Sequence, residues 1–428
     1  MMNFQECMKF VNSYSKSGKP VTDLSRAERL MKLVGNPEKR LDFIHVAGTN
    51  GKGSTVEYIS NTLIYSGYKV GQFTSPFVLH YTDRIRINGR EIDEKSFCGI
   101  CEFIKNRIDD QPYSQFEITM AIAMWWFEME GCDIVVLEAG IGGLLDCTNV
   151  IESPLLCIIT SISLDHTAIL GDTVEKIAEQ KAGIIKEKSI TILSADNNKS
   201  ISKIIRKTAE KKKSFFVQPI ESSIEICDTI STTHFSYLKG FKKKKYKLSM
   251  AGNCQVFNAV TAIEACFWLR TRYGFKIPEE SIEKSLETTC VKARMQYIYG
   301  EPTVIVDGGH NCVGIQNLAL ELSGWKKIDK KIYIVMGMVD SKDYEVGVHT
   351  IAPYSEKMFT VDDFAANAVP ALKLAEIAEN ITSAEPCNSL SEAVEEAKAL
   401  ALENNGIVVV CGSLYLASKY LNNYKKDK

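Results

Sequence analysis

The sequence lacks the features that would anchor the protein in a membrane or direct it through one. Its 428 residues contain no stretch of about 18 uninterrupted apolar residues, so no membrane-spanning helix is expected. Residues 1–19 contain no apolar core of the kind that a secretory signal requires. We therefore expect a cytoplasmic protein whose partners do not include a membrane.

An excess of charge of either sign is also lacking. Lysine and arginine total 51 against 53 for aspartate and glutamate, which gives a formal net charge of -2. This balance gives no reason to expect nucleic acid as a partner. The 13 cysteines are scattered, and in the absence of an export signal we expect reduced, mostly buried thiols. The Cys98-x-x-Cys101 pair has no second pair and no nearby histidine, so we interpret its spacing as chance.

Apolar segments of strand length alternate with helical patterns along most of the chain. Residues 41–47, 133–137 and 155–161 are typical of buried parallel strands, and residues 51–64 and 116–127 have helical spacing. This alternation predicts βαβ units and an α/β fold with a covered, mostly parallel sheet.

The segment from residue 214 to residue 248 has a different pattern. Its short alternating stretches predict a smaller antiparallel sheet at the edge of the first domain. We interpret the lysine run at 242–245 as a solvated face of that sheet. Helices are expected at 256–273 and 278–288.

A turn-rich stretch at 299–302 precedes a second series of strands and helices. The strands expected in this series are residues 303–307, 331–336 and 406–411. We predict one domain over residues 1–297, with the nucleotide site, and a Rossmann-like domain over residues 298–428.

The strongest motif is a turn rich in glycine and hydroxyl groups, His45-Val-Ala-Gly-Thr-Asn-Gly-Lys-Gly-Ser-Thr55, between a strand and a helix. Such a turn presents backbone N–H groups at a helix N-terminus, where a phosphate binds. Lys52 can reach the β- and γ-phosphates of a nucleotide, and Ser54 can supply a hydroxyl to Mg²⁺. The strict P-loop pattern is broken because Gly53 separates the lysine from the serine. An ordinary glycine-rich turn is the alternative.

Acids and a histidine follow three of the predicted strands. Glu138 ends one strand and is placed to hold Mg²⁺, because ligands bind beyond the carboxyl ends of parallel strands. Asp165 and His166 follow another strand, so we expect them at the same edge of the sheet. Asp307 follows a strand of the second domain, where an acid can bond a ribose hydroxyl. A strand-end turn without a ligand is the alternative in each case.

Two basic residues are harder to interpret. Arg294, near the domain junction, could stack on adenine or clamp a phosphate, or it could be a surface side chain. By its local pattern alone, Lys181 would be interpreted as a surface lysine.

Further motifs follow one another in order from residue 33 to residue 415. They are Leu33-Val-Gly-Asn-Pro-Glu-Lys39, the turn at 45–55, Phe73-Thr-Ser-Pro76, Asp83-Arg-Ile-Arg-Ile-Asn-Gly89, Glu138-Ala-Gly-Ile-Gly-Gly143, Leu145-Asp-x-Thr-Asn149, the segment 162–173, Lys181-Ala-Gly-Ile-Ile-Lys186, Gln255-x-x-Asn258-Ala, Ala293-Arg-x-Gln296, Asp307-Gly-x-His-Asn311, Gly337-Met, Lys342-Asp343 and Gly412-Ser-Leu-Tyr415. In this order they resemble the folylpolyglutamate synthase/dihydrofolate synthase family, a branch of the Mur ligase superfamily.

The resemblance implies an ATP-dependent, ADP-forming ligase that adds L-glutamate to a folate-type carboxylate through an acyl phosphate. The acceptor would be tetrahydrofolate, dihydropteroate or both. It also implies a P-loop-type Mur-ligase ATPase domain followed by a Rossmann-like domain. The expected cofactors are ATP and one or two Mg²⁺ ions, and the expected assembly is a monomer.

The resemblance further implies roles for individual residues. Those that would contact ATP are Asn50, Gly51, Lys52, Gly53, Ser54, Asn258, Arg294 and Asp307. Those that would hold metal are Ser54, Ser75, Glu138 and His166. Those that would act in catalysis are Lys52, Glu138, His166, His310 and Lys181, which matches a position that is often carbamylated. Those that would bind the folate-type substrate are Leu24, Ser25, Arg26, Ser114, Phe116, Glu117, Leu145, Asp146 and Cys147.

The chain also departs from the family pattern. Leu144 stands where arginine is usual, and Phe77 stands where histidine often follows Ser-Pro. These departures leave open a Mur-type ligase that acts on a different carboxylate. A protein that binds and hydrolyses ATP without ligation is a second alternative. A dinucleotide-binding dehydrogenase is disfavoured because no Gly-x-Gly-x-x-Gly follows a first strand.

Overall fold

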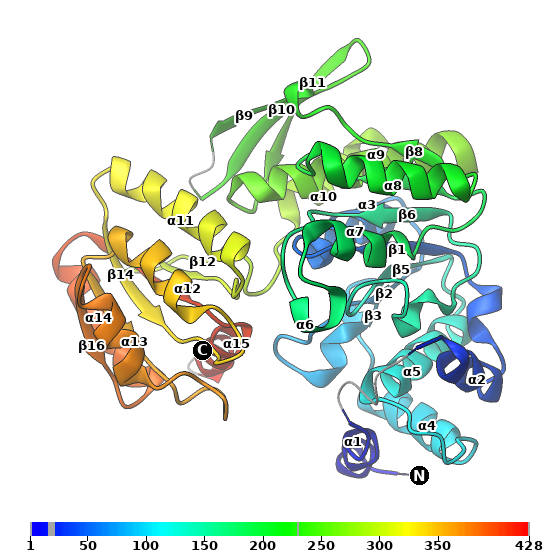
Figure 1. Ribbon diagram of the computed structural model, residues 1–428, viewed down its shortest axis with the longest axis horizontal. Helices are drawn as coiled ribbons and strands as arrows, with labels where there is room; N and C mark the ends of the chain where they lie inside the picture. The colour runs from blue at the N-terminus through cyan, green and yellow to red at the C-terminus, as the bar shows by residue number, and fades with distance from the viewer. Residues whose placement is uncertain (1, 16–21, 229–230, 427–428) are drawn as a thin grey trace. The chain divides into compact units, whose positions relative to one another are not determined.

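The computed structural model describes residues 2–15, 22–228 and 231–426, which form two compact α/β units. The first unit comprises Met1–Ser223 and Phe257–Leu286, and the second comprises Ile224–Val256 and Glu287–Lys428. The α/β class predicted from the alternating pattern is confirmed (Figure 1). Among the described helices, none combines the length and the apolar character needed to cross a bilayer.

The first unit is built on an eight-stranded sheet in the order β4-β3-β2-β5-β1-β6-β7-β8. The strands β2, β5, β1, β6, β7 and β8 are parallel, and β3 and β4 add an antiparallel edge. The bounds are β1 Phe43–Ala47, β2 Val70–Phe73, β3 Ile85–Ile87, β4 Arg90–Glu91, β5 Ile134–Glu138, β6 Leu156–Ile159, β7 Ile190–Leu193 and β8 Phe215–Val217. Every residue of β1, β2, β5, β6 and β7 is buried, as expected for a covered parallel sheet.

Helices surround this sheet, and α3 packs directly on β1, β2 and β5. The helices of the first unit are α1 Phe4–Asn12, α2 Ser25–Leu33, α3 Lys52–Tyr65, α4 Glu94–Lys105, α5 Gln115–Met129, α6 Thr167–Leu170, α7 Val174–Ala182, α8 Lys199–Lys211 and α10 Glu279–Thr288. Helix α9, Asn253–Tyr273, begins in the second unit and continues in the first. The Cys98-x-x-Cys101 pair lies in α4, and both thiols are buried.

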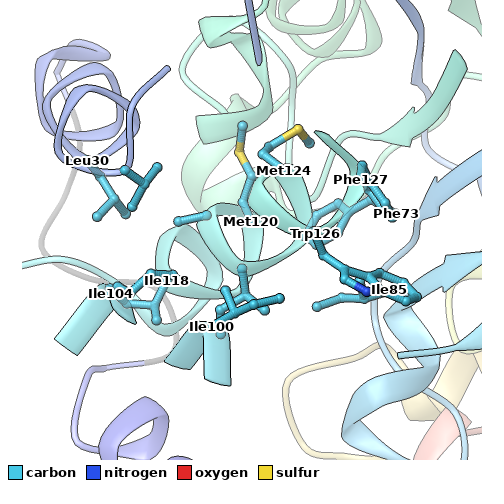
Figure 2. Packing of buried hydrophobic residues seen from close by; sticks show 14 of the residues in the cluster. Leu30, Phe73, Ile85, Ile100, Ile104, Ile118, Met120, Met124, Trp126 and Phe127 are labelled. Atoms are coloured by element: carbon cyan, nitrogen blue, oxygen red, sulfur yellow. The ribbon is translucent and has the colours of Figure 1, made fainter. Parts of the chain in front are cut away.

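The largest described core of the first unit centres on α5, which is buried on nearly all sides. Figure 2 shows Met120, Met124, Trp126 and Phe127 of this helix within a cluster that includes Ile100 of α4. An unbroken apolar helix of this kind needs covering elements around its circumference. Helices α1, α2 and α4 and strand β2 all pack against α5 and supply part of this cover.

The second unit contains two sheets. Its six-stranded sheet has the order β12-β13-β17-β14-β15-β16 and is parallel except for the edge strand β12. The bounds are β12 Gln296–Ile298, β13 Val304–Val306, β14 Lys331–Met336, β15 Lys357–Thr360, β16 Ser383–Pro386, β17 Gly406–Cys411, α11 Cys312–Lys327, α12 Tyr344–Ile351, α13 Ala371–Ala378, α14 Leu390–Glu403 and α15 Leu414–Lys426.

The other sheet of the second unit is antiparallel, in the order β11-β10-β9. Its strands are β9 Ile224–Asp228, β10 Thr233–Lys239 and β11 Lys242–Leu248. An antiparallel sheet was expected here, but its strands group with the second unit rather than with the edge of the first. The predicted division at residue 297 stays a prediction.

Truncation of Phe127 should destabilise the first unit, because this fully buried ring on α5 touches a closely packed core. We expect Phe127→Ala to lower the free energy of unfolding by about 3–5 kcal/mol. Met129→Ala, on the same helix but 58% exposed, should change it by less than about 0.5 kcal/mol. Urea unfolding followed by the fluorescence of the adjacent Trp125 and Trp126 measures both. Equal destabilisation by the two variants would contradict the described packing.

Candidate functional site

The glycine-rich turn joins the end of β1 to the start of α3 and is tied to the chain beyond β6. The backbone N–H of Thr49 donates to the carbonyl of Ser161 at 2.8 Å, and the Thr160 hydroxyl donates to the carbonyl of Asn50 at 2.7 Å. A Cβ atom at Gly48 would lie 1.8 Å from the Thr160 hydroxyl oxygen. The turn can therefore pack against β6 only because residue 48 has no side chain.

A second glycine of the turn is required by α9. Gly51 has a φ of +83° and forms the N-cap of α3, a conformation that favours glycine. A Cβ atom there would lie 2.1 Å from the side-chain oxygen of Asn258. The buried amide of Asn258 thus lies directly against the turn, and its contact with a nucleotide stays a prediction.

Lys52 and Glu138 lie close together at the carboxyl ends of β1 and β5. The Lys52 ammonium donates to the carbonyls of Gly48 and Thr49 at 3.2 and 3.3 Å, and lies 3.8 Å from a carboxylate oxygen of Glu138. Glu138 is only 3% exposed and accepts a hydrogen bond from the backbone N–H of Ser75 at 3.3 Å. Three residues predicted from separate motifs therefore meet at one edge of the sheet.

The hydroxyl groups at the start of α3 and the carboxylate at the end of β5 are oxygen ligands of the type that magnesium prefers. Ser54 and Thr55 are buried in the first turn of α3, and the Thr55 hydroxyl oxygen has no hydrogen-bond partner. Gly53 leaves an approach open, since a Cβ there would come no nearer than 3.7 Å to the Glu138 carboxylate. The described residues contain no group of three or more His, Cys, Asp or Glu side chains that could hold a metal. Mg²⁺ takes few protein ligands, prefers oxygen atoms, and keeps water and phosphate oxygens.

The predicted metal ligand His166 occupies a less enclosed position. It is exposed and forms the N-cap of α6, with a left-handed φ of 50°. Its backbone N–H donates to the carboxylate of Asp165 at 2.9 Å. The structure places His166 after β6, at the same edge as the glycine-rich turn, which is bonded to Ser161.

Lys181 is buried, contrary to the surface position that its local pattern indicates. It lies in the last turn of α7, is 3% exposed and donates to the carbonyl of Gly48 at 2.7 Å. Burial and the positive charge of Lys52 lower the pKa of Lys181 to about 7, although Asp165 acts in the opposite direction. The lowered pKa makes the uncharged, nucleophilic form of this amine more accessible than in an exposed lysine.

A second cluster contains several residues predicted to bind the organic substrate. The Arg26 guanidinium donates to Glu117 at 2.8 Å, and both side chains are largely buried. Glu117 also accepts from the backbone N–H of Ser114 at 2.7 Å, completing the capping box of α5. The Phe116 ring leaves no space for a side chain at Gly140, where a Cβ would lie 2.7 Å from the ring.

Asp146 and Cys147 extend this cluster. The carboxylate of Asp146 accepts from the backbone N–H groups of Ile141 and Thr148 at 2.8 and 3.0 Å, which shapes the loop after β5. Burial, together with the negative charges of Asp146 and Glu117, holds the pKa of the Cys147 thiol well above its usual value. Cys147 is therefore an inert thiol near both carboxylates.

The remaining residues of the predicted substrate set have looser surroundings. Leu24 is the N-cap of α2, and the hydroxyl of Ser25 donates to Asp23 at 2.5 Å. Leu145 is partly exposed beside Leu144. Apolar side chains thus remain in contact with solvent at the rim of the loop.

Arg84 is a functional candidate that the sequence reasoning did not single out, although its motif was noted. Its guanidinium lies 5.1 Å from the ring centre of Tyr81, 5.6 Å from that of Phe77 and 5.8 Å from that of Phe116. The side chain is 7% exposed, and its Nε atom has no hydrogen-bond partner. A buried cation with an unused donor next to Phe116 is suited to an anionic group of a substrate. The aromatic residues that precede it at 77 and 81 were the available signal.

The second unit holds its own set of predicted residues at the end of β13. Asp307 accepts from the backbone N–H groups of Met295 and Gly309, both at 2.8 Å. Burial raises the pKa of Asp307, and the nearby charge of Arg294 opposes that rise. His310 lies in the same turn, with Nδ1 3.0 Å from the carbonyl of Gly308.

The motif that follows β17 lies beside this turn. A Cβ atom at Gly308 would lie 2.6 Å from the side chain of Leu414, so the segment 412–415 contacts the segment 307–310. The structure thus forms two groups of candidate residues, with the turn, Glu138, Lys181 and the substrate cluster in the first unit. The second unit holds Arg294, Asp307 and His310.

Comparison with protein families gives matches over both units. A model described as the Mur ligase middle domain matches residues 46–266, and one described as the Mur ligase glutamate ligase domain matches residues 293–414. The chain is 33% identical over 433 residues to a dihydrofolate synthase/folylpolyglutamate synthase of Bacillus subtilis, covering 97% of each chain. It is 28% identical over 433 residues to a folylpolyglutamate synthase of Lacticaseibacillus casei, again covering 97% of each.

Solved structures are similar over almost the whole chain. A folylpolyglutamate synthase of Thermotoga maritima superposes with a TM-score of 0.85 at 26% identity, covering 99% of this chain and 97% of that chain. An FPGS–AMPPCP complex gives a TM-score of 0.85 at 25% identity, covering 99% and 100%. The order of motifs, the two α/β units and these matches agree: the chain belongs to the Mur ligase family, in its folylpolyglutamate synthase/dihydrofolate synthase branch.

Proposed function

We propose that this chain joins L-glutamate to a folate-type carboxylate, using ATP and releasing ADP and phosphate. The observation that carries this proposal is the convergence of Lys52, Glu138 and Lys181 on the turn at 48–51. The same unit holds the cluster of Arg26, Phe116 and Glu117. Its relatives named as folylpolyglutamate and dihydrofolate synthases, and an AMPPCP complex of one such enzyme, support the assignment. We further propose that the enzyme works as a cytoplasmic monomer.

The chemistry begins with activation of a poor electrophile. A carboxylate repels nucleophiles and has no good leaving group, so transfer of the γ-phosphoryl group of ATP converts it to an acyl phosphate. The protein contributes alignment and charge neutralisation rather than covalent bonding. The backbone N–H groups of the turn and the Lys52 ammonium would bind the phosphates. Ser54, Ser75 and Glu138 would hold Mg²⁺, which when bound neutralises phosphate charge.

Amide formation follows when the neutral amino group of glutamate attacks the acyl carbon and phosphate leaves. The tetrahedral state carries an oxyanion, and one well-placed donor for such a charge contributes about 3 kcal/mol. The candidates for this role are His166, His310 and the bound metal ion. Water must be excluded from the acyl phosphate, since hydrolysis would waste it.

The acceptor is proposed to bind in the first unit. The Phe116 ring and the buried Cys147 offer an apolar surface, and Glu117 and Asp146 offer acceptors for the N–H groups of a pterin-like ring. Arg84, with its unpartnered Nε, would contact the acceptor carboxylate. The second candidate function is a ligase that acts on a more apolar carboxylate. The exposed apolar side chains of Leu144 and Phe77 favour it.

A substrate panel tests the proposed function. With ATP and glutamate, we expect an amide product of the expected mass from dihydropteroate or tetrahydrofolate, and none from unrelated acids. Lys52→Ala and Glu138→Gln should each lower ADP release at least a hundredfold, because each removes a group that faces the phosphates. Met129→Ala serves as the unaffected control. ADP release without any amide product would contradict ligation, and full activity of Lys52→Ala would contradict the site.

Lys181 is proposed to carry a carbamate, formed when its neutral amine attacks CO₂ and a proton is released. The carbamate would add a carboxylate beside the turn at Gly48. In ¹³C-bicarbonate we expect a carbamate NMR signal that grows as the pH rises through about 7, because only the deprotonated amine reacts.

Substitution separates this carbamate from other lysine adducts. Lys181→Arg should abolish the signal and the ligase activity together, whereas Lys186→Arg, on the segment just after α7, should retain the signal. A wild-type protein that remains active but shows no carbamate at any pH above the pKa of Lys181 would refute the modification.

A further inference from the structure

Strands β10 and β11 form a hairpin with an unusual tip. Lys239 pairs with Lys242 as the last pair of the ladder, leaving Gly240 and Phe241 as the two-residue turn. Gly240 has a φ of +61°, which suits a tight hairpin turn. The Phe241 side chain is fully exposed. A ring in this position contributes nothing to the core of its own sheet.

The charge of this hairpin is strongly one-sided. Residues 233–248 include six lysines and no aspartate, glutamate or arginine. Lys243 forms an ion pair with Glu225 of β9, the strand on the other side of β10. The whole chain has a formal net charge of -2, but residues 233–248 carry a local excess of positive charge.

Strand alternation gives the two faces of the hairpin different characters. Phe235, Tyr246 and Leu248 are buried on one face, where the rings of Phe235 and Tyr246 stack at 5.3 Å. On the other face, the ladder sets Lys245 opposite Ser236 and Lys247 opposite His234. Lys243, Lys245 and Lys247 thus form a row on this face of β11, and the exposed Lys242 adjoins Phe241 at the tip, on the face of Tyr246.

Edge protection explains only part of this arrangement. Strand β11 is at the edge of its sheet, and lysines on an edge strand discourage pairing with another chain. That role accounts for the lysine row. It gives no reason for a fully exposed aromatic ring at the tip, because an exposed ring promotes association instead of preventing it.

We propose that this hairpin docks the protein on an anionic lipid surface. The Phe241 ring would enter the interfacial layer, where aromatic rings are favoured, and the lysines would face the headgroups. Lysine acts as a mobile point charge that suits a fluid layer of anionic headgroups. Such docking is peripheral and needs no membrane-spanning helix.

Single-stranded nucleic acid is the less favoured partner. Nucleic-acid platforms stack successive bases on several aromatic side chains and commonly add arginine. This hairpin exposes one ring at its tip, and residues 233–248 contain no arginine.

Vesicle sedimentation with the full-length protein tests the docking. We expect binding to vesicles of phosphatidylglycerol mixed with phosphatidylcholine, no binding to phosphatidylcholine alone, and weaker binding at high salt. Each lysine near such a surface contributes roughly fivefold in affinity. The triple variant Lys242→Gln/Lys245→Gln/Lys247→Gln should therefore lose on the order of a hundredfold. Phe241→Ser should lose roughly tenfold while all lysines remain.

A matched variant separates the hairpin from overall charge. Lys203→Gln/Lys207→Gln/Lys211→Gln removes three lysines from the exposed face of α8 and should leave vesicle binding unchanged. Unchanged ligase activity in all variants would show that they fold. Equal losses from the two triple variants, no preference for anionic vesicles, or tighter binding to a single-stranded oligonucleotide would each overturn the proposal. The proposal would also be overturned if the native protein bound no vesicles and the hairpin triple variant aggregated. The lysines would then be explained by protection of the edge strand.

Discussion

The candidate site depends on one backbone carbonyl, that of Gly48, which accepts hydrogen bonds from the amines of both Lys52 and Lys181. Two ammonium groups at one buried acceptor would repel each other, and burial makes that repulsion costly. Burial, with a smaller contribution from the charge of Lys52, lowers the pKa of Lys181 to about 7. The turn therefore gives two lysines different surroundings: Lys52 lies near Glu138, and the deeply buried Lys181 has the lowered pKa.

The rest of the first unit holds this turn in place. Thr160 and Ser161 bond it from beyond β6, and Asn258 closes against Gly51 from α9. Glu138 reaches the turn because β5 and β1 are parallel neighbours, with Val46 in register with Glu138. Buried strands and helices thus support a site whose polar groups would be costly to bury without partners. The substrate cluster depends on the same core, because Glu117 caps the buried helix α5.

Charge in this protein is distributed by function rather than balanced locally. Around Glu138 and Arg26, acidic and basic side chains are paired and mostly buried. On β11, five lysines accumulate at the edge of a sheet whose other face packs aromatic rings, and the nearest acids of the sheet, such as Glu225, lie on β9 beyond β10. The same residue type is thus proposed for phosphate binding in one place and for surface attraction in the other, and the difference between the two places is burial.

The sequence by itself determined the α/β class, the main strands and helices, and the edge of the sheet at which the site lies. The periodicity of apolar residues indicates which face of a helix or strand is buried. Parallel strands bring their carboxyl ends to one edge of the sheet, so the sequence predicted that Glu138 and the turn lie at the same edge. Ordered motifs then indicated the family. The antiparallel sheet was expected from its hairpin pattern, but a pattern of this kind does not say against which core a small sheet packs, and its strands group by contacts with the second unit.

Only the tertiary structure decided the environments of single side chains. Burial of Lys181, the pairing of Arg26 with Glu117 across 91 positions, and the aromatic surroundings of Arg84 all arise from long-range packing. A local pattern cannot report desolvation by residues far away in the chain, and desolvation is what lowers the pKa of Lys181. The sequence also did not predict that Phe241 is exposed. An aromatic residue among lysines can be buried or exposed, and only the packing around it decides.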